Sequence, residues 1–393
     1  MDFQLFNVLR SFSSLAPPNT IQFPKNFSPK SINDFLLHNI LLNYHFQTYP
    51  PSQQYQKRFW KWAIENLEAL ARERSVEELD NDFEIDPRIY NHYLAVMAPS
   101  GPATGSSGPS TRSQICGKGL PLQVAPPAQT YITHFWNLET RFSDLTTSES
   151  KLSIEDYQST TLLESRTTIE SGTTGLRTWL ASFVLAQYLI LHPEITTSKR
   201  VLELGSGIGF LGSVVASLQL LSQSAEKSPQ SSSPSLWLTD INNEVLSRCR
   251  DNVNLPCNMS SSHQDVNYLK LDWSESIEAE QSLSLVTLIH KKIDPEIILG
   301  ADVIFDPSLI LPLVGTLKIA LQSSDCSRKS KVALIALTVR NDTTVNKFLN
   351  HVQELSLPIQ ELEAGFNETF FSDTVEAHSS CESVKLFRIT STS

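Results

Sequence analysis

Apolar residues recur along the first quarter of the chain with the spacing of a helix. Between residues 31 and 98, positions such as Trp60, Ile64 and Leu67 stand three or four residues apart. Residues at this spacing lie on one face of a helix, where they pack into a core. We therefore predict that residues 1–98 form a helical N-terminal domain.

From about Gly172 onward, short apolar runs alternate with helical stretches. Strands are predicted at 200–204, 236–240, 267–271, 296–303 and 331–339. Helices are predicted at 174–194, 208–221, 242–253, 307–321 and 341–355. Alternating strands and helices are typical of an α/β fold, in which helices cover both faces of a parallel sheet.

Further strand-like segments lie on either side of this alternation. Residues 130–142 have the pattern of a strand, and a short extended pair is predicted around 151–165. The segments 367–371 and 383–390 have no long helix between them. Because parallel neighbours need a long crossover connection, we expect these last two strands to form an antiparallel hairpin at the sheet edge.

Two polar segments interrupt the pattern. Residues 99–129 begin with a stretch rich in Gly, Pro and Ser, which is typical of a linker. The serine-rich run SQSAEKSPQSSSPS at 222–235 is predicted to be a disordered surface insertion. The chain then divides into a helical domain at 1–98, a linker at 99–129 and an α/β domain at 130–393.

Charge and cysteine content narrow the classes of function. The net charge is −11, and no cluster of Lys and Arg suited to a nucleic-acid backbone is evident in the sequence. The five cysteines are scattered and never form a CxxC pair, so neither a disulfide framework nor a metal site is predicted. The N-terminus lacks the apolar core of a signal peptide, and no run approaches the roughly 20 apolar residues of a membrane helix. We expect a soluble, cytoplasmic monomer with no nucleic-acid or membrane partner.

The run RVLELGSGIGFLG at 200–212 carries the first candidate chemistry. Its glycines are Gly205, Gly207 and Gly209, and Phe210 stands where a dinucleotide fingerprint has its third glycine. Glu203 precedes the turn inside the strand end. This pattern favours a ligand without a pyrophosphate and with a positively charged amino-acid portion, which describes S-adenosylmethionine. Glycines also end strands for structural reasons alone.

Asp240 ends the next predicted strand. A carboxylate at this place can accept hydrogen bonds from both hydroxyls of a ribose. Its distance from Gly205 along the chain exceeds the usual spacing of about 20 residues, but approaches it when the insertion 222–235 is left out. The alternative is that Asp240 caps the following helix.

Two further strand ends carry compatible groups. After the third strand, Asp272 could accept the amino group of an adenine and Trp273 could cover the ring, or Trp273 could be an ordinary core residue. After the fourth strand, the small Ala301 would let a cofactor approach, and Asp302 and Phe305 would face the substrate. The alternative for Asp302 is again a helix cap.

These residues belong to motifs that resemble the family-16 seven-strand methyltransferases, and within them the lysine methyltransferases of translation elongation factor 2. The motifs are GTTGLRTW (172–179), VLELGSGIG (201–209), LDW (271–273), GADVIFDP (300–307) and TVRN (338–341). The resemblance implies a seven-strand, Rossmann-like methyltransferase sheet with an N-terminal helical domain. It also implies transfer of methyl groups from S-adenosylmethionine to a lysine of elongation factor 2.

The resemblance assigns roles residue by residue. It implies cofactor contacts from Trp179, Gly205, Ser206, Gly207, Asp240, Trp273 and Ala301. It places Asp302 and Phe305 beside the substrate lysine, in an acid-x-x-aromatic motif. Relatives often carry an acid after the Trp, where this chain has Leu180.

Other functions remain open from the sequence. A methyltransferase could act on another protein or on a small molecule, because the fold does not fix the acceptor. A non-catalytic binding module on the same fold is also compatible with Leu180. We further hypothesise that the N-terminal helices help to dock a protein substrate.

Overall fold

A seven-stranded sheet forms the centre of the protein. The computed structural model describes residues 1–75, 83–98, 129–138, 154–225, 233–322, 330–363, 371 and 383–391. The sheet order is β5-β4-β3-β6-β7-β9-β8. Its parallel strands are β3 (Arg200–Leu204), β4 (Ser235–Asp240), β5 (Val266–Lys270), β6 (Ile297–Ala301) and β7 (Val332–Thr338). The chain runs from β3 outward to β5 and returns to β6 on the other side of β3. The predicted α/β fold is therefore confirmed, with its topological switch point between β3 and β6.

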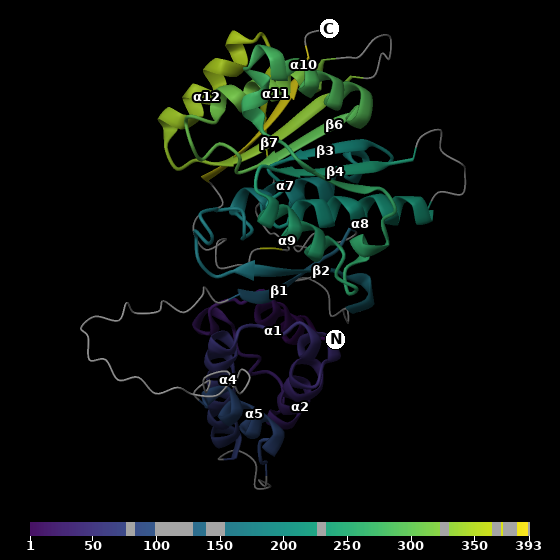
Figure 1. Ribbon diagram of the computed structural model, residues 1–393. Helices are drawn as coiled ribbons and strands as arrows, with labels where there is room; N and C mark the ends of the chain where they lie inside the picture. Colours follow the sequence, from purple (N-terminus) through teal and green to yellow (C-terminus); the bar gives the residue numbers. More distant parts are fainter. Residues whose placement is uncertain are drawn as a thin grey trace, which may run out of the picture.

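Helices cover both faces of this sheet (Figure 1). On one face lie α7 (Leu180–Leu191), α8 (Phe210–Ala225) and α9 (Asn243–Val253). On the other lie α10 (Ala279–Thr287), α11 (Ile310–Leu321) and α12 (Asp342–Glu354). Neighbouring residues of β3 enter different cores, since Val201 belongs to one buried cluster and Leu202 to the other. Burial on both faces explains why the strands are almost continuously apolar.

The N-terminal region is helical, as predicted, and its helices begin earlier than residue 31. They are α1 (Phe3–Ser13), α2 (Pro29–Phe35), α3 (Tyr44–Thr48), α4 (Gln53–Ser75) and α5 (Pro87–Met97). The carboxylate of Asp2 caps α1 by accepting the Gln4 N–H at 2.8 Å. None of the described helices has the length and apolarity needed to cross a membrane.

A two-stranded sheet connects the helical region to the main sheet (Figure 1). It pairs β1 (Gln129–Trp136) with β2 (Gln158–Ser165) in antiparallel register. On one side, the Ser13 hydroxyl of α1 donates to the Thr133 carbonyl at 2.8 Å. On the other side, β2 contacts α8 and α9. The Asn258 side chain accepts the Thr161 N–H at 2.7 Å and donates to the Thr161 carbonyl at 2.8 Å.

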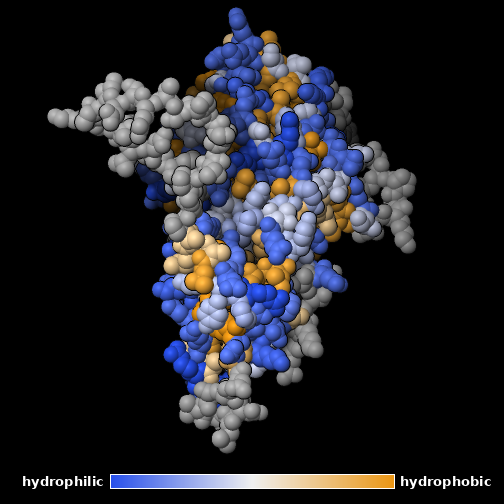
Figure 2. Space-filling model, turned by 60° about the horizontal axis from the view of Figure 1, so that its bottom comes forward, coloured by the Kyte–Doolittle hydropathy of each residue, from blue (hydrophilic) through white to orange (hydrophobic). Residues whose placement is uncertain are grey.

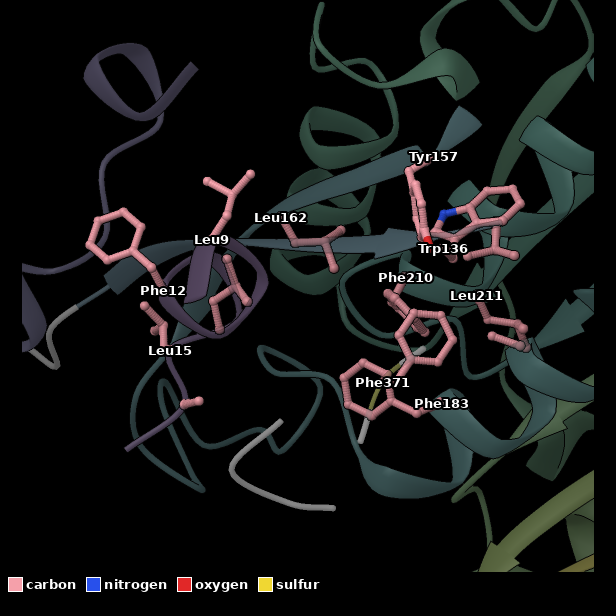
Figure 3. Close-up of a cluster of buried hydrophobic side chains, with 14 of the residues drawn as sticks. Leu9, Phe12, Leu15, Trp136, Tyr157, Leu162, Phe183, Phe210, Leu211 and Phe371 are labelled. Carbon is pink, nitrogen blue, oxygen red and sulfur yellow. The ribbon is translucent and has the colours of Figure 1, made fainter. Parts of the chain in front are cut away.

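The pair of strands lies within one continuous core. Phe12 of α1 and Phe210 of α8 belong to the same cluster of buried hydrophobic residues. Figure 3 shows this cluster, with Leu9 and Phe12 of α1 on one side of the view, Phe210 and Leu211 of α8 on the other, and Leu162 of β2 between them. Around Phe210 the rings of Phe183 and Phe371 lie 4.7 and 5.4 Å away between centroids. The division at residues 98 and 130 stays a prediction, because apolar packing runs across it.

Several predicted boundaries are wrong. The helix predicted at 174–194 begins only at Leu180, because residues 173–178 form a loop at the site described below. Residues 222–225 continue α8 and do not belong to the insertion, whose residues 226–232 lie outside the described part of the chain. The linker 99–129 also lies outside it, except for Gln129, which begins β1.

The edge hairpin is antiparallel, as predicted, but its first strand is different. β9 (Val384–Thr390) pairs with β8 (Ile359–Leu362), a strand that the sequence did not reveal. Of the predicted strand 367–371 only Phe371 is described, and it lies buried in a turn. The helix α10 between β5 and β6 was also missed. The strand predicted at 130–142 ends at Trp136, and the extended pair at 151–165 contributes only β2 among the described residues.

Candidate active site

A cavity of about 340 Å³ lies at the carboxyl ends of the parallel strands. This edge is where open α/β sheets bind ligands, and the volume is in the range of small-molecule sites. Ten of the predicted site residues line it: Trp179, Gly205, Ser206, Gly207, Asp240, Asp272, Trp273, Ala301, Asp302 and Phe305. The structure therefore brings together residues that are more than a hundred positions apart. Glu203 and Gly209 are not among the lining residues.

The turn after β3 has no room for a side chain at Gly205. Its φ of +67° favours glycine, and a Cβ there would come within 2.8 Å of Val303 Cγ1. Ser206 fixes the turn against β4, because its N–H donates to the Thr239 carbonyl at 2.7 Å and its hydroxyl oxygen accepts the Thr239 N–H at 2.9 Å. The turn thus presents its backbone to the cavity in a fixed position.

Gly209 has a structural role at the start of α8. A Cβ at this position would lie 2.8 Å from Cys249 Sγ and 3.3 Å from the Cys249 carbonyl. The absence of a side chain allows α9 to approach the turn. The prediction that Gly209 contacts a cofactor stays a prediction. In the structure, Gly209 allows the start of α8 to pack closely against α9.

Glu203 lies beneath the turn and is buried. Its Oε2 has no hydrogen-bond partner among the described residues. Burial raises the pKa of Glu203 to about 8; a side-chain hydrogen bond from Ser206 opposes this, and the nearby Asp240 adds to it. The side chain is therefore neutral over much of the physiological pH range, unlike the carboxylate that the sequence predicts beside a positive group.

Asp240 ends β4 at the cavity, as predicted. It accepts the Asn242 N–H at 3.0 Å, while Asn242 itself caps α9 by accepting the N–H of Glu244 at 2.8 Å. The proposed alternative, that Asp240 caps the helix, therefore does not apply. Burial raises the pKa of Asp240, and backbone hydrogen bonds from Asn242, Gly207 and Ile241 counteract this increase.

The turn after β5 gives Asp272 and Trp273 different surroundings. Asp272 Oδ1 accepts the N–H of Ser274 at 2.9 Å and its hydroxyl at 2.7 Å, so this acid caps the short helix Trp273–Ser276. The amino group of an adenine would have to bind to the acceptor positions of Asp272 that Ser274 leaves unused. Trp273 is half-buried and lines the cavity, so it is not an ordinary core residue.

Asp302 follows β6 in a left-handed conformation, with φ +56°. Its carboxylate accepts the Thr338 N–H at 3.0 Å and the Thr338 hydroxyl at 3.1 Å. It also forms an ion pair with Arg340, whose Nη2 lies 2.9 Å from Oδ2. Asp302 does not cap α11, because the residue at the N-cap is Leu309; Asp306 stabilises the turn before this helix by accepting the Ser308 N–H at 2.8 Å. Phe305 lines the cavity with 53% of its surface exposed.

Two arginines at the cavity were not predicted as site residues. The guanidinium carbons of Arg177 and Arg340 lie 5.0 and 5.2 Å from the ring centroid of Trp179, within the range of cation–π contacts. The Trp179 indole N–H donates to the Thr174 carbonyl at 3.0 Å, which holds the ring in place. Both arginines stand inside motifs that the sequence had singled out, GTTGLRTW and TVRN, and that was the available signal.

Comparisons with known proteins agree with this geometry. Residues 158–355 match the sequence family described as lysine methyltransferase. The chain is 28% identical over 248 residues to the protein-lysine N-methyltransferase EEF2KMT of Bos taurus, covering 58% of this chain and 65% of the relative. For the human protein of the same name, the identity is 33% over 193 residues, covering 48% and 53%. The matched region thus spans about half to two thirds of these relatives.

A third relative covers the N-terminal helices as well. A putative uncharacterized protein of Dictyostelium discoideum is 22% identical over 376 residues, which is 93% of this chain and 89% of that protein. The N-terminal helices and the main sheet therefore occur together in a second chain.

The residues of the cavity fit S-adenosylmethionine, the cofactor of this site. Gly205 lines the cavity without a side chain, so a ligand can approach the backbone of the turn directly. Asp240 supplies a carboxylate for the ribose hydroxyls. Trp273 and Ile241 line the cavity beside it with apolar surface suited to an adenine ring.

Proposed function

We propose that this chain, which belongs to the lysine methyltransferase family, transfers methyl groups from S-adenosylmethionine to a lysine of translation elongation factor 2. The observation that carries the proposal is a single cavity that joins the glycine turn at Gly205 to Asp302 and Phe305. The motifs shared with elongation-factor methyltransferases support the choice of acceptor, as do the relatives named EEF2KMT. We expect the enzyme to act in the cytoplasm. We also expect it to be a monomer, because one chain forms the whole cavity.

The chemistry requires little from the protein beyond alignment and desolvation. S-adenosylmethionine supplies a methyl group that is already activated on a sulfonium. The residues of the cavity then orient the target amine and exclude water from it. The amine must arrive without its proton, since only its lone pair can form the new N–C bond. Burial of the lysine and the positive charge of Arg177 at the cavity lower the pKa of that amine and favour its neutral form; the charge of Arg340 is compensated by Asp302.

Asp302 is proposed as a substrate-positioning residue. Thr338 and Arg340 together supply four donors to its two carboxylate oxygens, which is about the full acceptor capacity of a carboxylate. A lysine can therefore bond to Asp302 only by displacing one of these donors. The exposed guanidinium of Arg340 is the donor best able to move, whereas Thr338 belongs to β7. Phe305 is proposed to form the apolar wall of the lysine channel.

The N-terminal helices are proposed to help dock the protein substrate. The face of the molecule in Figure 2 carries apolar patches among polar surface. The exposed large hydrophobic residues of the N-terminal helical region include Leu42, Leu94 and Met97. Such side chains on a helical region beside the catalytic domain are compatible with a partner surface.

A labelling experiment tests the proposed function. The purified protein would be incubated with methyl-labelled S-adenosylmethionine and a lysate from cells that lack it. We expect one labelled band with the size of elongation factor 2, and label on lysine after hydrolysis of that band. Label in small molecules alone, or no label although calorimetry shows cofactor binding, would contradict the assignment.

A further inference from the structure

Four arginines form a row that begins at the cavity and ends on the N-terminal helices. Arg340 and Arg177 line the cavity and contact Trp179, as described above. The row continues with Arg166, which follows β2, and Arg58, which lies on α4. It therefore joins three parts of the chain that are far apart in sequence.

Backbone geometry places Arg166 beside Arg177. The N–H of Ser165 donates to the carbonyl of Leu176 at 2.8 Å, so Arg166 and Arg177 directly follow two hydrogen-bonded residues. The neighbouring residues of this pair are joined as well, because the Thr178 hydroxyl donates to Glu164 at 2.7 Å. The end of β2 and the loop before α7 are thus fixed to each other.

Hydrogen bonds place the start of α4, which carries Arg58, beside the end of β2. The Ser52 N–H just before α4 donates to the Thr130 hydroxyl at 2.7 Å, and Thr130 of β1 is paired with Glu164 of β2. The side chain of Arg166 reaches solvent, but the surrounding protein atoms lower its pKa by desolvation. Glu164 raises this pKa, while the positive charges of Arg177 and Arg58 lower it further. Arg58 also acts, together with Arg166, on the pKa of the buried Tyr55, one helical turn away on α4. The charge of Arg166 is therefore close enough to that of Arg177 on one side and that of Arg58 on the other to be repelled by both.

Little negative charge from the chain itself neutralises the outer end of this row. Glu164 is buried and accepts hydrogen bonds from Thr178, and Asp302 is paired with Arg340. Among the described residues, neither Arg58 nor Arg166 has a hydrogen bond or ion pair through its side chain. Like charges held near one another repel, and negative charge supplied by a partner would compensate this repulsion.

We propose that the arginine row, defined by Arg58, Arg166, Arg177 and Arg340, binds an acidic segment of the protein substrate next to the target lysine. Guanidinium groups bind carboxylates through two parallel hydrogen bonds, and an acidic segment would relieve their mutual repulsion. The row ends at the cavity, so a segment bound along it leads a neighbouring lysine to Asp302 and Phe305. The target lysine is part of the proposed function, on which this inference rests. The acidic segment is the chemical feature by which the enzyme would select that lysine.

Direct binding of an acidic probe tests the row independently of methyl transfer. A fluorescein-labelled oligoglutamate peptide would be titrated with the full chain in the presence of S-adenosylmethionine, and anisotropy recorded. We expect the double variant Arg58→Glu and Arg166→Glu to weaken binding by about tenfold. Binding of the wild type should also weaken as salt is added, because the groups are exposed.

Lys57→Glu is the matched control. Lys57 is the neighbouring exposed residue on α4 and undergoes the same change of charge as each of the two arginines in the double variant, but it does not belong to the row. We expect this variant to bind the peptide within about twofold of the wild type, as surface charges contribute little singly. Equal loss in Lys57→Glu and in the double variant would overturn the proposal, because it would indicate only a general charge effect. Cofactor affinity, measured by calorimetry, should be unchanged in all variants and shows that they are folded.

Two further outcomes would also decide the matter. If a single-stranded RNA oligonucleotide bound the wild type more tightly than the peptide and lost binding in the double variant, the row would belong to nucleic acid and the proposal would be wrong.

With elongation factor 2 as methyl acceptor, the double variant should raise KM and leave kcat unchanged. If the wild type did not methylate that protein but bound the peptide, the proposed acceptor would fail while the arginine row would stand.

Discussion

Asp302 combines burial, a left-handed backbone and a carboxylate with all its acceptor positions in use. A residue with a Cβ adopts this backbone conformation at some energetic cost, and such residues concentrate at functional sites. Asn tolerates the same conformation. Exchange of the carboxylate for an amide therefore changes charge and hydrogen bonding with little change in the strain of the chain.

We expect Asp302→Asn to reduce kcat/KM for methyl transfer by about a hundredfold, because positioning of the amine accounts for an effect of that order. Cofactor affinity should remain within about threefold of the wild type. The control is Asp306→Asn, four residues further on, in an exposed turn outside the cavity. Full activity of Asp302→Asn, measured with labelled cofactor, would remove the residue from the mechanism.

A comparison of alanine substitutions at Gly205 and Gly172 distinguishes the effect of backbone strain from that of a steric clash. Both have a positive φ, +67° and +76°, but a Cβ at Gly172 would meet nothing within 4 Å. An alanine at either position therefore has a similar conformational cost of roughly 1 kcal/mol. Only at Gly205 would it also collide with Val303 and enter the cavity.

We expect Gly205→Ala to weaken binding of S-adenosylmethionine by at least about tenfold, since a displaced Val303 or turn reshapes the wall of the cavity. Gly172→Ala should lower the melting temperature by the conformational cost alone, and so less than Gly205→Ala, and leave cofactor affinity within about twofold of the wild type. Isothermal calorimetry measures both affinities. Equal affinities in the two variants would show that the turn does not contact the cofactor.

Glu203 makes the stability of the protein depend on pH. Its pKa in the folded chain is about 8, against a value of 4.5 in the absence of the fold. A group with a raised folded pKa contributes stability below the unfolded pKa and loses it as pH rises through the folded pKa. The contribution of Glu203 to the free energy of unfolding should therefore fall between about pH 4.5 and about pH 8.

We expect Glu203→Gln to remove this loss, because the amide has nearly the same shape and cannot ionise. Thermal melts of both proteins without cofactor, at several pH values, give the difference in stability. That difference should shift in favour of the variant by an amount on the order of a few kcal/mol from pH 5 to pH 8. A constant difference across this range would mean that Glu203 is already ionised in the folded chain.

At the residue scale, the sequence predicted the lining of the cavity well because parallel strands end at one edge of a sheet. Any polar or small residue after such a strand, as Asp240, Ala301 and Asp302 are, must face the same region. Hydrogen bonds could not be predicted in this way. The cap at Asp272 and the ion pair between Asp302 and Arg340 depend on turn geometry that periodicity does not encode.

At the scale of elements, prediction worked where apolar periodicity was strong and failed where the element was short or half-exposed. The missed strand β8 has only four residues, two of them exposed. The missed helix α10 has few buried side chains. Segment 173–178 contains helix-compatible residues, but hydrogen bonds of the loop, such as that between Thr178 and Glu164, override that tendency.

Two buried asparagines attach β2 to the main domain: Asn252 accepts the Leu163 N–H at 2.8 Å, and Asn258 binds the next hydrogen-bonding position, Thr161. Asn258 is buried and satisfies both the N–H and the carbonyl of Thr161, and its amide also donates to the Asn252 carbonyl at 2.8 Å. Removal of its amide would leave buried backbone groups without partners, at a cost of about 1–3 kcal/mol for each group.

We therefore expect Asn258→Ala to lower the free energy of unfolding by roughly 2–4 kcal/mol, measured by denaturant titration. The control is Asn254→Ala at a nearby exposed position, whose effect should stay within about 0.5 kcal/mol. A small effect at Asn258 would mean that water or a shifted strand replaces its hydrogen bonds.

At the scale of the whole molecule, the sequence suggested two domains joined by a linker, whereas the core is continuous between them. Pattern analysis finds apolar faces but not their partners, so it could not predict that α1 packs on β1. Phe6 of α1 is fully buried and lies 4.5 Å from Tyr157 and 5.9 Å from Phe135 between ring centroids. The helices and the sheet should therefore unfold together.

We expect Phe6→Ala to lower the melting temperature of the entire protein in a single transition, at a cost of about 3–5 kcal/mol. S-adenosylmethionine should raise the temperature of that same transition, since it binds only the folded state. Tyr44→Ala, at a side chain that is 79% exposed on the same helical region, should have little effect. Two separate transitions by calorimetry, with only one shifted by the cofactor, would contradict the continuous core.

Because the pair β1–β2 is packed into the core, it also sets the distance between the two places at which a substrate would bind, the arginine row and the cavity. Because buried side chains of the described residues pack continuously from α4 to the main domain, we expect the span between Arg58 and Asp302 to be of nearly constant length. An acidic segment and a lysine in the same protein would then be recognised only when their separation matches that span. The selectivity of the enzyme would be a matter of spacing as much as of sequence, and inserting residues between the two features of a substrate should abolish methylation without altering either feature.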